Sequence, residues 1–138
     1  MHAWAYDKWT DENGVTWEFV GDGYTYATLY GCSQTEGDIV VPTTVDIDNG
    51  WKTYTINAIG NRAFQNSQVT SITIPENVIK IGTSAFEGCT NLKSVNIPDG
   101  VTKIENYTFE KCSSLESITL PAGITSIGDA AFKECTSL

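Results

Sequence analysis

The chain has 138 residues, of which 41% are apolar and 18% charged, so it is long enough for one folded domain with a hydrophobic core. Its 17 acidic residues outnumber its 8 basic ones and leave a net charge of −9, which argues against nucleic acid or an anionic membrane as a partner, since both need a basic patch. No apolar run approaches the roughly 20 residues of a membrane span, so we do not expect membrane insertion.

The first 58 residues predict a β-rich cap. Residues 1–13 carry no clear pattern, but residues 14–20 and 24–30 each predict a strand, and Gly21-Asp22-Gly23 between them predicts a hairpin turn. We expect a short strand at 38–41, a turn at 46–50 and another strand at 51–59. The hairpin should lie across the first repeat described below and shield it from water, because an uncovered repeat end exposes its core.

Residues 59–138 contain one pattern four times. The copies begin 22, 23 and 23 residues apart, and the last one is cut short. A fixed period of this length predicts stacked repeats, in which each copy buries its apolar residues against its neighbours. The copies begin at Ile59, Ile81, Ile104 and Ile127, and each has a phenylalanine five positions later, at Phe64, Phe86, Phe109 and Phe132.

Within a copy, the sequence predicts a single helical turn followed by a short strand. In the second copy Thr83 is a good N-cap, so we expect a turn of helix in which Ala85 and Phe86 point inward. Residues 92–97 alternate apolar and polar side chains and then reach a Pro-Asp-Gly turn, which predicts a strand. Strands of successive copies should pair in parallel, about 4.8 Å apart. The other cap positions are Asn61, Asn106 and Asp129.

The repeated motif Ile-Gly-x-x-Ala-Phe-x-x-Cys-x-x-Leu-x-x-Val-x-Ile-Pro-x-x-Val closely resembles the BspA-like class of leucine-rich repeats. The resemblance covers residues 59–138 and extends weakly back to residues 41–45, which mimic residues 97–101. It implies a curved solenoid. Together with the single helical turns and the N-terminal hairpin cap predicted above, this gives a fold that is mainly β within the α/β repeat class. The family is found mostly in bacterial surface proteins that adhere or bind, so the resemblance implies a secreted or cell-surface location and a class of function without a named ligand.

Three cysteines share one position of the repeat. Cys89, Cys112 and Cys135 are spaced 23 and 23 apart, so they should form one column of the stack. Metal sites usually contain close pairs such as Cys-x-x-Cys, and parallel neighbouring side chains rarely reach disulfide geometry. We therefore predict a column of buried free thiols, and we expect Cys32, outside the column, to be free as well.

No residue pattern points to catalysis, a cofactor or a metal. Asp46, Asp48 and Asn49 before Gly50 suggest a calcium loop, but Gly50 is fifth and Asn57 twelfth, where an EF-hand needs a glycine sixth and a glutamate twelfth. We predict a hydrated turn there. The single histidine, His2, lies at the terminus, and no phosphate loop or nucleophile motif occurs, so a non-enzymatic protein is expected.

Eight of the ten aromatic residues in the first 58 positions admit two interpretations. They could stack on sugar rings, or they could alternate because one strand face is buried. The first interpretation makes this region a carbohydrate-binding accessory part of a larger extracellular enzyme. The residues are Trp4, Trp9, Trp17, Tyr24, Tyr26, Tyr30, Trp51 and Tyr54.

The remaining candidates are the polar residues that alternate with buried ones along the repeat strands. Such residues project together from one face of a sheet, where they could meet a flat protein or glycan surface, or simply water. They are Ser71, Thr73, Ser94, Asn96, Ser117 and Thr119.

The sequence therefore favours a non-catalytic, adhesion-type module that binds a host or bacterial surface protein or a glycan, with a structural spacer as a further alternative. The fourth copy stops where the others begin their strand, and no secretion signal is present, so we expect a fragment of a longer protein. An uncovered last copy also predicts fraying beyond Ile127 and weak, salt-promoted self-association through the C-terminal end.

Overall fold

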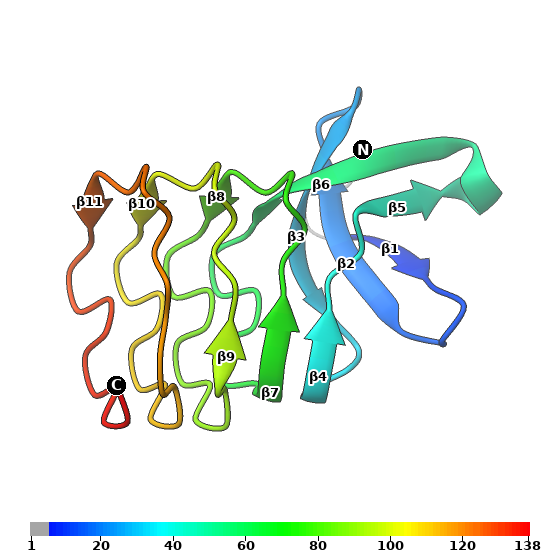
Figure 1. Cartoon of the computed structure of the whole chain (residues 1–138). Coiled ribbons are helices and arrows are strands. Elements are labelled where there is room, and N and C mark those ends of the chain that lie inside the picture. The colour runs from blue at the N-terminus through cyan, green and yellow to red at the C-terminus, as the bar shows by residue number, and fades with distance from the viewer. Residues whose placement is uncertain (1–5) are drawn as a thin grey trace.

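The N-terminal part of the chain forms a twisted sheet that covers one end of a stack of coils (Figure 1). The computed structural model describes residues 6–138. The order of the sheet is β1-β2-β3-β6-β5, and the predicted hairpin is confirmed as the antiparallel pair β2–β3. The bounds are β1 (Asp7–Thr10), β2 (Thr16–Gly21), β3 (Tyr26–Cys32), β5 (Thr44–Ile47) and β6 (Lys52–Ile59).

Strand β6 joins the cap to the stack. It pairs in parallel with β3 on one side and with β8 (Lys80–Ile81), the first strand of its kind in the repeats, on the other. Because one strand belongs to both parts, the division of the chain at residue 58 stays a prediction. The turn predicted at 46–50 is shorter than expected, since β5 continues to Ile47 and a 3₁₀ turn, η1 (Asp48–Gly50), follows it.

The repeats stack two rows of short strands, as Figure 1 shows. One row is the sheet β4-β7-β9, and the other continues from β6 through β8 to the pair β10–β11. All these pairs are parallel, so the predicted parallel pairing is confirmed where strands form. The strand predicted at 92–97 is shorter than expected, since β9 has two residues and the third copy forms no strand beside it. The remaining bounds are β4 (Glu36–Val40), β7 (Gln68–Thr73), β9 (Ser94–Val95), β10 (Lys103–Ile104) and β11 (Ser126–Ile127).

The predicted helical turn is wrong, because a series of tight turns takes its place. In the second copy Ser84 and Gly88 have positive φ values of 58° and 74°, which no α-helix contains. Every second backbone N–H closes a turn within the copy, as Ala85 N–H does on Gly82 O at 3.2 Å. The N–H groups between them donate to the next copy, as Phe86 N–H does to Thr108 O at 2.9 Å. A helix would direct these N–H groups along its own axis and leave none to join the copies.

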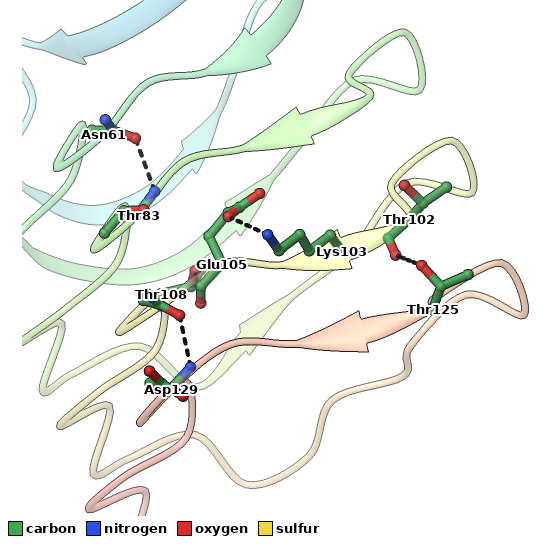
Figure 2. Close-up of polar contacts among 9 residues, drawn as sticks. Asn61, Thr83, Thr102, Lys103, Glu105, Thr108, Thr125 and Asp129 are labelled. Carbon is green, nitrogen blue, oxygen red and sulfur yellow. Dashed lines mark hydrogen bonds and ion pairs between the residues drawn. The ribbon is translucent and has the colours of Figure 1, made fainter.

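The cap residues Asn61 and Asn106 have a different role from the predicted one. Figure 2 shows the Asn61 side chain reaching the next copy, where its Oδ1 accepts the N–H of Thr83 at 2.9 Å. Asn106 Oδ1 accepts the N–H of Asp129 at 2.7 Å in the same way. Each asparagine is followed one copy later by a glycine, Gly82 or Gly128, whose Cβ would collide with the amide. The turns and the two asparagines therefore form a third hydrogen-bonded wall, which we call the turn wall (residues 60–67, 82–89, 105–112 and 128–135).

The core runs through the whole stack as a ladder of side chains. The rings of Phe64, Phe86, Phe109 and Phe132 stack with centroid distances of 5.7, 5.4 and 5.5 Å. Phe86 and Phe109 are fully buried, which confirms the inward assignment of this position. Offset stacking at these distances adds to the area burial of each ring, so neighbouring copies stabilise each other.

Candidate functional site

The polar row predicted on the repeat strands lies on the outer side of the sheet β4-β7-β9 and its continuation in the third copy. Ser71 is paired with Ser94 in register, and Ile72 is paired with Val95, so residues two apart share a face. All six residues are exposed except Ser71, which is half-buried. The row lines two neighbouring hollows of about 340 and 310 Å³, the first over Ser71 to Asn96 and the second over Ser94 to Thr119.

Two of the six residues are occupied by bonds within the protein. The amide of Asn96 bridges to the preceding copy, because its Nδ2–H donates to Ile74 O at 2.9 Å and its Oδ1 accepts Ile74 N–H at 2.7 Å. The hydroxyls of Ser71 and Thr70 donate to Asp38 Oδ1 at 2.7 and 2.9 Å, and these bonds lower the pKa of the Asp38 carboxyl. Asn96 and Ser71 therefore hold adjacent strands in register.

The other four residues keep free hydroxyls. Within residues 6–138 no partner bonds the hydroxyls of Thr73, Ser94, Ser117 and Thr119. Thr73 and Ser94 lie on the paired strands β7 and β9, about 4.8 Å apart, and Ser117 and Thr119 follow in the third copy in a segment that forms no strand. The result is a rigid, uncharged set of donors and acceptors on one face, which we call the hydroxyl row. Asp99 lies at its edge in the second hollow.

The cysteine column is confirmed as free thiols in the core. Cys89 and Cys112 are fully buried, Cys135 is half-buried, and Cys32 is free as expected. Each column thiol donates to the carbonyl of the phenylalanine one copy earlier, as Cys89 Sγ does to Phe64 O at 3.0 Å. Burial raises the pKa of the Cys89 thiol to about 12 and raises that of Cys112 as well. These thiols are neutral at physiological pH and act in packing rather than as nucleophiles.

The residues of the candidate calcium loop form the end of β5, at the edge of the cap sheet, and the 3₁₀ turn that follows it. Asp46 lies in β5, where its Oδ1 accepts the hydroxyl of Thr53 at 2.6 Å. Asn49 adopts a left-handed conformation with φ 57° in η1. The side chain of Asp48, like His2 and Trp4, lies outside the part of the chain that the structure describes. Among the described side chains, no group of three His, Cys, Asp or Glu residues is placed to hold a metal ion.

The described aromatic residues of the cap do not form one platform. Trp17 and Tyr54 are buried in the core, which follows the alternation argument. Tyr30 stacks on Tyr6 at 4.7 Å on the outer face of the sheet. Trp9 is half-buried on β1. Tyr24, Tyr26 and Trp51 are exposed at turns and strand ends.

The comparison with protein families agrees with the repeat geometry. Residues 57–138 match the BspA-type leucine-rich repeat region in six copies. The chain belongs to the BspA-type leucine-rich repeat family. Leucine-rich repeats of this family are generally non-enzymatic, and the mainly β, curved solenoid expected from the resemblance is confirmed.

Solved bacterial proteins share the whole fold. A leucine-rich repeat protein from Bacteroides ovatus is 33% identical, with a TM-score of 0.78, and the match covers 96% of this chain and 33% of that one. A leucine-rich cell surface protein from Faecalibacterium prausnitzii is 32% identical, with a TM-score of 0.78, over 97% of this chain and 36% of that one. This BspA-type chain thus spans about a third of the length of these two relatives.

A shorter relative is matched over most of its length. The leucine-rich repeat protein from Bacteroides capillosus is 31% identical, with a TM-score of 0.68, over 84% of this chain and 88% of that one. No curated protein is similar enough to match. Within residues 6–138 no helix is long and apolar enough to cross a membrane.

Proposed function

We propose that this BspA-type repeat region is a non-catalytic recognition module of a bacterial surface or secreted protein, and that it binds a protein or glycan of a host or bacterial surface through the hydroxyl row. The observation that carries the proposal is the difference between the two kinds of polar residue on this face. Ser71 and Asn96 are used to hold the strands, whereas the hydroxyls of Thr73, Ser94, Ser117 and Thr119 make no hydrogen bond to any residue that the structure describes.

Rigidity makes such a row suitable for binding. The copies that carry the row are joined by the stacked phenylalanines of the core and by the turn wall, so little conformational entropy is lost when a partner orders the hydroxyls. The row carries no charged side chain of its own, which favours a partner that offers hydrogen bonds rather than a strongly charged surface. The Faecalibacterium prausnitzii relative is a cell surface protein, which supports the proposed location.

Arginine substitutions on the two rows of strands test the proposal. Ser117→Arg places a large charged side chain in the second hollow of the hydroxyl row, and Ser126→Arg places the same side chain on the exposed β11 of the other row. Both variants should fold like the parent chain. Binding to a panel of immobilised matrix proteins and glycans should be lost with Ser117→Arg and kept with Ser126→Arg.

The alternatives are separated by the same experiment. If the parent chain binds nothing on the panel, the structural-spacer interpretation is favoured. If binding is present but Ser117→Arg leaves it unchanged, the binding surface lies elsewhere and the hydroxyl row is not the site.

A further inference from the structure

A hollow of about 580 Å³ lies in the cap, between β1 and the turn that follows β5, away from the hydroxyl row. Its volume is within the ~300–1,000 Å³ of small-molecule sites. It is lined by Lys8, Trp9, Thr10, Asp46, Asn49 and Gly50.

An aromatic side chain forms the apolar part of this hollow. Trp9 is half-buried, because it packs against the core of the cap and also faces the hollow. Trp9 is paired with Trp17 on β2, and Trp17 is buried and bonded to Asp11 through its indole N–H at 3.0 Å. Trp9 therefore lies beside a fixed neighbour on the same face of the sheet.

The polar groups that line the hollow include a positive and a negative charge, and most of their hydrogen-bonding capacity is free. The ion pair recorded within residues 6–138 is Lys103–Glu105, so the Lys8 ammonium and the Asp46 carboxylate have no ionic partner there. Asp46 accepts a bond from Thr53 through Oδ1, which leaves Oδ2 free. The Asn49 amide has no partner among the described residues and supplies both a donor and an acceptor.

We propose that this hollow binds a neutral sugar ring, which stacks on Trp9 and hydrogen-bonds to Asp46 and Asn49, while Lys8 points to the other face of β1 and contributes only its charge. A sugar presents an apolar C–H face and hydroxyls that both donate and accept, and the hollow offers an aromatic face with donors and acceptors beside it. Lys8 and Asp46 cancel in charge, and the net charge of −9 repels acidic sugars. Among the described side chains the hollow has one carboxylate, that of Asp46, which suits a hydroxyl better than a calcium ion, since calcium takes six to eight oxygen ligands.

Sugar titration of the purified chain tests the site. Glucose, galactose, mannose and N-acetylglucosamine are added separately, and the indole signal of Trp9 is followed by NMR. At least one sugar should give a saturable shift that is insensitive to salt. Trp9→Ala should weaken binding at least tenfold, and Trp51→Ala should leave it unchanged, because Trp51 is highly exposed nearby but does not line the hollow.

A second variant keeps the test decisive if Trp9→Ala fails to fold. Asn49→Gly removes the amide at a left-handed position that glycine adopts without strain, so it should keep the fold of the parent chain. It should weaken sugar binding several-fold. The proposal is overturned if none of the four sugars saturates the signal, if glucuronate binds better than glucose, or if Asn49→Gly binds like the parent. Loss of the hydroxyl row by Ser117→Arg should not affect this site.

Discussion

The second and third copies differ from the fourth in burial although their sequences follow the same pattern. Ile104 is fully buried, while Ile127 at the same repeat position is 52% exposed. Cys112 and Phe109 are fully buried, while Cys135 and Phe132 are half-buried. The pattern of one copy therefore does not determine how well its core is covered. Coverage comes from the neighbouring copies, as expected for a quasi-one-dimensional stack.

The largest effect should come from the phenylalanine ladder. Phe86→Ala removes a fully buried ring between two stacked neighbours and leaves a cavity, so the free energy of unfolding should fall by about 3–5 kcal/mol. Phe132→Ala removes a ring with a neighbour on one side and should cost clearly less. Chemical denaturation of both variants measures the difference. Equal losses would mean that neighbouring copies do not share their stability.

The turn wall gives the next effect. A Cβ on Gly82 would lie 2.5 Å from Asn61 Oδ1 and 2.6 Å from the Asn61 backbone nitrogen, so Gly82→Ala should push the first two copies apart at a cost of about 1–3 kcal/mol. Gly123→Ala is the matched control, because its nearest neighbour would be Asp99 O at 3.9 Å. The control should be neutral or slightly stabilising. Thermal melts of the two variants distinguish them, and a harmless Gly82→Ala would show that the close approach is not needed.

The thiols give the smallest effect and a pH dependence. The folded-state pKa of Cys89, about 12, lies above its ordinary value of 9.0, so unfolding favours the thiolate. The thiol contribution to stability is therefore complete below pH 9 and is lost as the pH rises towards 12. In the native protein Cys135 should react with a thiol reagent before Cys89 and Cys112, and denaturant should expose four thiols. A native Cys112 that reacts as fast as Cys135 would contradict the burial difference.

The sequence predicted the parts of the fold that depend on apolar periodicity. The positions of Phe86, Cys89 and Ile104 in the core and the parallel pairing of copies all follow from one repeated spacing. The turn wall was mistaken for a helical turn because Asn61 and Thr83 are common both at helix N-caps and in turns. The available clue was the pairing of an asparagine with a glycine one copy later, which indicates a side chain crossing between copies.

The candidate sites were harder to predict for a physical reason. Alternation along a strand shows that Ser94 and Asn96 face outward, but it does not show that the Asn96 amide turns back to bond Ile74 while the Ser94 hydroxyl stays free. In the cap, the sequence pattern around an aromatic residue is the same whether the residue is covered by other parts of the sheet or left open to solvent. Which of them is covered depends on the sheet order, which places Trp17 in the core and Trp9 beside a hollow.

The open side of the fourth copy also bears on self-association. Ile127 and Leu138 are more than half exposed there, and no described residue accepts the N–H of Phe132. We propose that two copies of the chain shield these surfaces from each other weakly, and that salt promotes the contact by screening the net charge of −9.

Amide hydrogen exchange of Phe86, Phe109 and Phe132 tests the central claim, that each copy is held by the next through the turn wall. Phe86 N–H donates to Thr108 O and Phe109 N–H to Ala131 O, both at 2.9 Å, so these amides should be strongly protected. Phe132 N–H should exchange quickly in dilute protein, and its protection should rise with protein and salt concentration if copies associate. Rapid exchange of Phe86 N–H, at a rate like that of Phe132, would contradict the account.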